Sequence, residues 1–143
     1  MGLVIKDNIA VDIEAKDWKE AIKVAGDLLV KSGHITEDYV HAMIDTVITF
    51  GAYIVICPGV ALAHARPEAG VISPGLSLAI LRNPVEFGHE SNDPVKLVFA
   101  LASIDHSCHI DALSVLSDII SDESKMESLF VASNASQVME ILC

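Results

Sequence analysis

The chain has 143 residues, 52% of them hydrophobic, and 20 acidic against 9 basic side chains give it a net charge of -11. This length fits one domain, residues 1–143, which can bury enough surface to fold without a disulfide or a metal. The acid excess argues against a nucleic-acid partner, because phosphate backbones are bound by clusters of Lys and Arg.

Hydropathy and cysteine usage both bear on where the protein works. The longest uncharged apolar stretch, residues 51–63, has 13 residues and is broken by Pro58 and Gly59, whereas a membrane span needs about 18 or more. The first 15 residues contain no apolar core of signal-peptide length. The three cysteines are odd in number and share no CxxC spacing, which favours free thiols. We therefore expect a cytoplasmic protein that does not insert into the membrane.

The first third of the chain predicts one strand and two helices. Residues 9–13 alternate loosely between apolar and polar and suggest a short strand. Asp17 and Glu20 have capping-box spacing before an apolar helical pattern that stops at Gly33. Thr36 is placed to cap a second helix. The apolar residues expected on its buried side are Val40, Met43, Ile44 and Val47.

The rest of the chain predicts strands followed by helices. The expected strands are residues 53–57, 60–63, 76–81 and 95–102, the last apolar enough to be buried on both faces. The polar stretch 83–94 is a surface connection. Ser107 is placed to cap a helix, a helical turn follows over 125–130, and Asn134 with Gln137 has capping-box spacing before the last helix. This order predicts an α/β (α+β) fold, with one mixed sheet flanked by helices.

The six histidines are the main candidates for reactive side chains. We expect His34 and His41 to have surface or structural roles. His64 follows an apolar strand and precedes Arg66 and a proline, a strand-end position where sites are commonly built. His109 falls in the first turn of a helix, where backbone N–H groups and the helix dipole favour anions. On these physical grounds alone, a site role for His109 and a plain helical role are equally supported.

Several common chemistries lack their sequence signatures. The chain has no GxxxxGK[ST], GxGxxG, GxSxG or HExxH motif. A cluster at one helix start keeps a metal-binding alternative open: Asp105, His106, Cys108 and His109. Neighbouring side chains at a helix start point in different directions, and no second cluster has ligand spacing, so we expect no metal site. Cys108 beside a histidine also has the elements of a nucleophile, but the signal is weak.

The segment from Gly51 to Val71, "GAYIVICPGVALAHARPEAGV", resembles the phosphorylation-site region of enzyme IIA domains of the bacterial sugar phosphotransferase system (PTS), mannitol/fructose type. Four segments, one of them the end of the segment just quoted, resemble the ascorbate-type (SgaA-like) subgroup. They are "WKEAIKVAGDLLV", "ARPEAGV", "PVEFGHESNDPV" and "ASIDHSCHIDAL". The resemblance covers about residues 6–142 and implies the mannitol-type enzyme IIA fold.

The resemblance also implies site residues. His64 takes the place of the phosphorylated histidine, and His109 that of the family's second active-site histidine. The sequence departs from the family pattern at Ala63, where Pro is usual, and at Ala65, where Gly is usual. Both changes leave the position of His64 in the pattern intact.

A third departure concerns the positive charge of the site. Mannitol-type members carry an active-site Arg in the second helix, and the matching position here is Thr46. Two alternatives follow: Arg66 supplies the positive charge for the phosphoryl group instead, or the site needs no such charge. The helix that starts near Ser107 is a second expected stabiliser, through its backbone N–H groups.

The activity implied by the resemblance is a phosphoryl relay. Phospho-HPr would donate to His64, and the group would pass to a cysteine of the cognate enzyme IIB for uptake of ascorbate or a related sugar by a membrane enzyme IIC. No cofactor is implied, and an acidic surface suits partners that present basic residues. One alternative function stays open, a PTS-like regulatory module that acts by phosphorylation-dependent protein binding. Assembly into a homo-oligomer also stays open.

Overall fold

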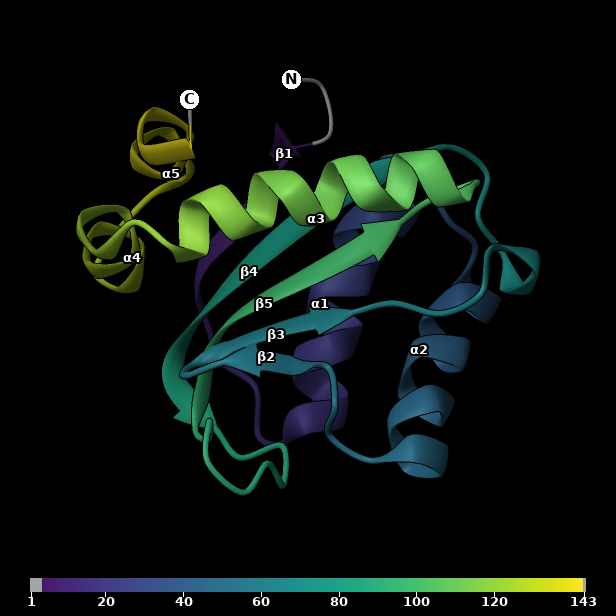
Figure 1. The fold of residues 1–143 in the computed structure, drawn as a ribbon, viewed down its shortest axis with the longest axis horizontal. Coiled ribbons are helices and arrows are strands. Elements are labelled where there is room, and N and C mark those ends of the chain that lie inside the picture. The colour runs from purple at the N-terminus through teal and green to yellow at the C-terminus, as the bar shows by residue number, and fades with distance from the viewer. Residues whose placement is uncertain (1–3, 143) are drawn as a thin grey trace.

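A five-stranded mixed sheet with strand order β1-β4-β5-β3-β2 forms the centre of the molecule, and helices cover both of its faces (Figure 1). The computed structural model describes residues 4–142, apart from the side chains of residues 4–7 and 106–109. The expected α/β architecture is confirmed. Helices α1 and α2 lie on one face, and α3 crosses the other with α4 and α5 beside it.

The strands are β1 (Val4–Ile13), β2 (Val55–Cys57), β3 (Val60–Ala63), β4 (Gly75–Val85) and β5 (Val95–Ala102). The predicted bounds of β3 and β5 are confirmed, while β1 and β4 are longer than expected and β2 is shorter. β3 pairs with β5 in parallel, and β4 pairs with β5 in antiparallel orientation. Because β3 and β5 run the same way, their carboxyl ends meet at one edge of the sheet.

The helices are α1 (Trp18–Lys31), α2 (Glu37–Phe50), η1 (Pro67–Ala69), α3 (His106–Ile120), α4 (Glu123–Phe130) and α5 (Ala135–Leu142). The predicted cap of α1 is confirmed, since Asp17 Oδ1 accepts from the Glu20 N–H at 2.9 Å. The predicted cap of α3 is wrong: this helix begins at His106, so Ser107 lies inside its first turn. The residue before the helix is Asp105, a type at least as favoured as Ser at an N-cap.

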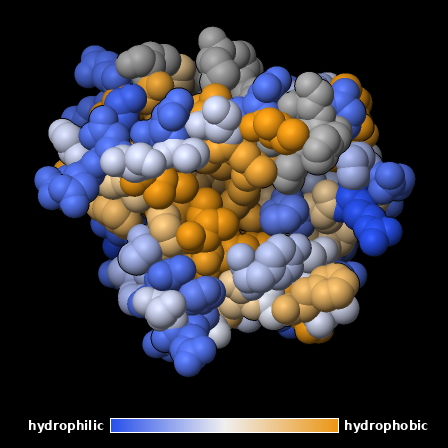
Figure 2. Space-filling model, in the orientation of Figure 1, coloured by the Kyte–Doolittle hydropathy of each residue, from blue (hydrophilic) through white to orange (hydrophobic). Residues whose placement is uncertain are grey.

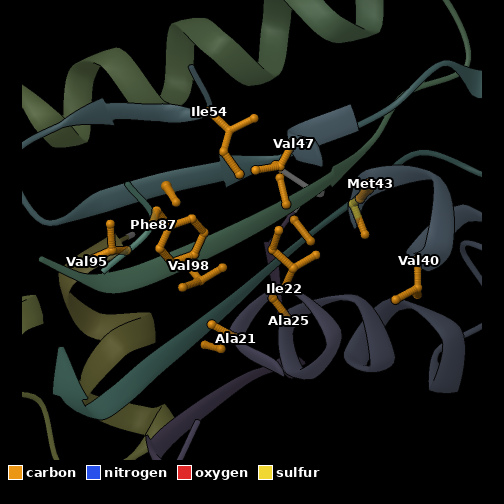
Figure 3. Close-up of a cluster of buried hydrophobic side chains, with 14 of the residues drawn as sticks. Ala21, Ile22, Ala25, Val40, Met43, Val47, Ile54, Phe87, Val95 and Val98 are labelled. Atoms are coloured by element: carbon orange, nitrogen blue, oxygen red, sulfur yellow. The ribbon is translucent and has the colours of Figure 1, made fainter. Parts of the chain in front are cut away.

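Each face of the sheet has its own apolar core, which explains why the central strands are apolar on both sides. Figure 3 shows part of the core beneath α1 and α2, with Ile22, Met43 and Val98 among its labelled side chains. Three of the four apolar residues expected on the buried side of α2 are buried, whereas Ile44 is only half-buried. Tyr39, which was not among the expected residues, is also buried. Tyr39 lies four residues before Met43 and so shares its helix face, whereas Ile44 lies at the edge of that face.

The connection between β4 and β5 is a polar surface loop, as predicted, but it is tightly organised. The Asp93 carboxylate accepts hydrogen bonds from the backbone N–H groups of residues 87–89 at 2.7–3.1 Å. The side chain of Phe87 is buried, and the Asn92 carbonyl accepts from the Gly59 N–H. This loop lies at the start of β3, at the opposite end of that strand from His64.

None of the helices in the described part of the chain combines the length and the apolar character that crossing a membrane requires. The longest of these α-helices, α3, has 15 residues. Cys57 is a free thiol, and burial raises its pKa.

Asn8 on β1 is a polar side chain in an apolar layer, and it gives a stability prediction. Its side chain is fully buried, and neither atom of its amide has a hydrogen-bond partner within the described structure. Asn8→Leu keeps the branching at Cγ and removes both unsatisfied groups, so we expect it to stabilise the protein by about 1–2 kcal/mol. Urea unfolding measures this, with Asn8→Asp as a destabilising control because it buries a charge. A less stable Asn8→Leu protein would contradict the prediction.

Candidate functional site

The candidate site lies where the carboxyl ends of β3 and β5 meet. His64 directly follows β3, and residues 103–105 connect β5 to α3. A cavity of about 490 Å³ opens between these segments and the C-terminal half of α2. Its polar lining residues include His64, Arg66, Thr46, Ser103 and Asp105. Two residues predicted from the sequence, His64 and Arg66, therefore share one cavity.

The His64 ring is held by the backbone of its own strand. Its Nδ1 atom lies 2.9 Å from the carbonyl oxygen of Leu62. A carbonyl can only accept, so in the neutral ring Nδ1 carries the proton and Nε2 carries the lone pair. Tyr53 meets the same ring edge to face, with ring centroids 5.7 Å apart. The site thus contains a half-buried imidazole in a fixed tautomer, with its nucleophilic nitrogen defined.

Arg66 brings a positive charge to the cavity. Its side chain is exposed, and it takes part in none of the ion pairs formed by the described residues, which involve Lys23 and Arg82. Thr46 lines the same cavity, but its hydroxyl donates to the Ala42 carbonyl at 2.8 Å. Of these two polar side chains, Arg66 is therefore the one suited to meet an anion in the cavity.

Ser107 and His109 belong to the first turn of α3, and their side chains lie outside the described part of the structure. The same holds for His106 and Cys108, so of the alternative metal cluster only the side chain of Asp105 is described. The backbone does bring this turn to the site, because residues 103–105 line the cavity and lead into α3. Among the described side chains, no group of three His, Cys, Asp or Glu residues could hold a metal ion.

Tyr39 is a residue of this region that sequence reasoning missed. Its hydroxyl donates to the Leu101 carbonyl at 2.8 Å and accepts from the Ala65 N–H at 3.0 Å. It therefore contacts both the segment after His64 and the strand that leads to α3. The only sequence signal is indirect, because Tyr39 is a phenol on the apolar face that Val40 and Met43 define.

Large apolar side chains surround the cavity without being buried. Phe50 is 73% exposed, Tyr53 50% and Ile104 51%. Figure 2 shows further apolar surface in a central hollow below α3, and the bordering elements carry the exposed side chains of Ile56 and Ile110. Exposed apolar groups gathered beside a reactive residue are typical of a protein-docking surface.

The chain is similar to known proteins over nearly its whole length. The model of the family described as "Phosphoenolpyruvate-dependent sugar phosphotransferase system, EIIA 2" matches residues 3–143. An ascorbate-specific PTS system EIIA component of Salmonella choleraesuis is 36% identical over 142 residues, which are 99% of this chain and 92% of the relative. A mannitol-specific cryptic phosphotransferase enzyme IIA component of Escherichia coli is 37% identical over 137 residues, 96% of this chain and 92% of the relative.

A solved structure supports the same assignment. The complex of enzyme IIAMTL with phosphorylated enzyme IIBMTL from Escherichia coli contains a chain that matches with a TM-score of 0.85 and 30% identity. The match covers 98% of each chain. The resemblance inferred from the residues is thus confirmed, and so is the mannitol-type fold. The chain belongs to the EIIA 2 family of the phosphoenolpyruvate-dependent sugar phosphotransferase system, whose members are phosphotransferase relay components.

Proposed function

We propose that this chain is a cytoplasmic phosphocarrier that accepts a phosphoryl group from phospho-HPr on Nε2 of His64 and passes it to a cysteine of the cognate enzyme IIB. The observation that carries the proposal is the hydrogen bond from His64 Nδ1 to the Leu62 carbonyl, which leaves the lone pair on Nε2 of a ring that lines the cavity. Similarity to ascorbate- and mannitol-specific relatives supports ascorbate or a related sugar as the transported substrate.

In the first transfer, the Nε2 lone pair of His64 attacks the phosphorus atom. The N–P bond of phospho-HPr breaks, and its electron pair returns to the HPr imidazole. The phosphorylated His64 ring keeps its Nδ1 proton, and the Leu62 carbonyl stabilises the positive charge that the ring gains. In the second transfer, a thiolate of enzyme IIB attacks the phosphorus, and the electron pair of the N–P bond returns to Nε2.

The rest of the site supplies position and charge, which are what phosphoryl transfer chiefly needs. Arg66 is exposed at the cavity and can donate to the phosphoryl oxygens. In the proposed mechanism, Arg66 is assisted by His109. It is also assisted by the N–H groups of the first turn of α3, including that of Ser107. The first N–H groups of a helix have no partner within the helix and so are available to an anion.

The surface around the cavity suits brief docking of basic partners. The exposed rings of Phe50 and Tyr53 supply apolar contact area, and the net charge of -11 attracts positive surfaces. In the Escherichia coli complex, a related IIA chain binds phosphorylated enzyme IIBMTL, which supports an enzyme IIB partner here. Because salt screens long-range attraction, both transfers should slow as ionic strength rises.

Intact-protein mass spectrometry tests the proposal on the wild-type chain. Incubation with phosphoenolpyruvate, enzyme I and HPr should add one phosphoryl group, in an adduct that is labile to acid. Enzyme IIB should then remove the group and carry it on a cysteine. If no adduct forms, the proposal fails. If the adduct forms but no enzyme IIB accepts the group, the regulatory alternative is favoured instead.

The role of Arg66 gives a prediction with a matched control. Arg66→Gln removes the charge from the cavity, and we expect labelling by phospho-HPr to slow roughly 10- to 100-fold, because charge-assisted hydrogen bonds contribute about 1.5–3 kcal/mol. Arg82→Gln makes the same change at a residue paired with Asp12 and Glu14 outside this cavity. Rapid-quench kinetics should show wild-type labelling for Arg82→Gln. Equal rates for both variants would show that Arg66 does not stabilise the phosphoryl group.

A further inference from the structure

The backbone ladder between β3 and β5 ends just before the site. Its last pair is Ala63 with Ala100. Beyond this pair the two segments separate, one continuing through His64 and the other through Leu101 toward α3. The cavity lies between the continuations of these two strands. A contact that joins the two segments where they separate therefore sets the width of the cavity.

The phenol of Tyr39 occupies that point. It accepts a hydrogen bond from the Ala65 N–H at 3.0 Å and donates its one proton to the Leu101 carbonyl at 2.8 Å, with the Ala65 carbonyl at 3.1 Å as the longer alternative. Ala65 directly follows His64, and Leu101 is two residues before Ser103. A single hydroxyl thus links the segment that carries His64 to the strand that leads into α3.

Burial makes this link rigid. The Tyr39 side chain is 1% exposed, so water has no access to replace the hydroxyl. Burial also raises the pKa of Tyr39, against the opposing effect of its hydrogen bond with Ala65, so the phenol keeps its proton at neutral pH. Tyr39 belongs to α2, which contributes Thr46 and Phe50 to the cavity wall. The hydroxyl therefore joins the three walls of the site.

We propose that Tyr39 is a positioning residue for phosphoryl transfer, which acts by fixing His64 relative to the start of α3. The inference rests on the proposed phosphocarrier function. Small displacements of reacting groups reduce transfer rates strongly, by up to about 100-fold for 1 Å. Tyr39 itself does not line the cavity, so it acts through the backbone of Ala65 and Leu101 rather than by touching the phosphoryl group.

Tyr39→Phe removes the hydroxyl and keeps the packed ring. We expect kcat for phosphoryl transfer from phospho-HPr to fall roughly 10- to 100-fold. KM for phospho-HPr should stay within about twofold, because the exposed rim is untouched. The Nδ1–H signal of His64 in ¹⁵N-resolved NMR spectra should also shift, since the ring moves relative to its surroundings.

Ser77→Ala is the matched control. The Ser77 hydroxyl is fully buried on β4 and donates to the Ala25 carbonyl at 2.7 Å, outside the cavity lining. Both variants lose a buried hydroxyl hydrogen bond, but only Tyr39→Phe should lose kcat and shift the His64 signal. If Tyr39→Phe keeps kcat within about twofold of Ser77→Ala, the inference is overturned.

A measurement on the wild-type chain keeps the inference testable even if Tyr39→Phe does not fold. The Ala65 amide proton, bonded to a buried phenol, should exchange with solvent at least about tenfold more slowly than the amide of exposed Glu68. Equal exchange rates would overturn the inference. Failure of the proposed function would look different: wild-type protein would not be labelled, while the slow Ala65 exchange would remain.

Discussion

His64→Gln is expected to abolish labelling by phospho-HPr, lowering its rate by at least about a thousandfold. Glutamine keeps a polar side chain of similar length whose amide can still donate hydrogen bonds. It has no basic nitrogen with a lone pair, so no N–P bond can form. Mass spectrometry after incubation with phosphoenolpyruvate, enzyme I and HPr measures the effect directly.

His41→Gln is the control for this experiment. It makes the same chemical change at an exposed histidine on α2 that lies outside the cavity lining. Its labelling should equal that of the wild type, and both variants should keep the wild-type circular dichroism spectrum. Full labelling of His64→Gln would place the phosphoryl group on another residue and end the proposed role of His64.

The parts of the fold that the sequence predicts are those where burial leaves a pattern in a short window. Residues 60–63 are apolar and buried throughout, and residues 95–102 are apolar and buried except for Lys96, which is half-buried. Both strands were therefore predicted with their observed bounds. The start of β1 was missed because Lys6, Asp7 and Asn8 interrupt its apolar pattern. Asn8 is nevertheless fully buried, which no rule of alternation would predict.

The site, like the fold, contains residues that the sequence predicts and residues that it does not. His64 was found from its place after a strand, and Arg66 from the family resemblance, because Thr46 stands where the family has an Arg; the cavity contains both His64 and Arg66. The sequence does not predict the hydrogen-bond acceptor of His64. This acceptor is the backbone carbonyl of Leu62, and every residue has such a carbonyl. Tyr39 is 26 positions from Ala65 and 62 from Leu101 in the chain, so only the folded sheet shows that they meet.

The segment after His64 is also fixed at its far end, by Gly70, and this gives the second large expected effect. Gly70 has a φ of 148°, a conformation that residues with a side chain rarely adopt. Its carbonyl accepts from the Thr36 N–H at 2.9 Å, which ties the segment to the start of α2. A Cβ atom on Gly70 would overlap Thr36 Oγ1 and would approach Tyr39 N to 3.2 Å.

Gly70→Ala should therefore lower the free energy of unfolding by about 2–5 kcal/mol, the sum of backbone strain and overpacking. Gly33→Ala is the control, because Gly33 has a φ of 85° but nothing within 4 Å of an added Cβ atom. It should cost only the strain, about 1–2 kcal/mol. Urea unfolding of both variants compares the two costs, and their difference contains the overlap together with the greater backbone strain at the φ of 148° of Gly70.

The same pair of variants also tests whether the segment after His64 must be held for transfer to occur. In the folded state, Gly70→Ala pushes the chain away from Thr36 and Tyr39, the two residues of α2 and its cap that anchor it. Labelling by phospho-HPr should then fall at a temperature where the variant is still folded, whereas Gly33→Ala should be labelled like the wild type. Suppose that Gly70→Ala is no less stable than Gly33→Ala and is labelled normally. Thr36 and Tyr39 would then move aside for the added Cβ atom without lowering the free energy of unfolding. The position of His64 would then not depend on how the segment is held at Gly70.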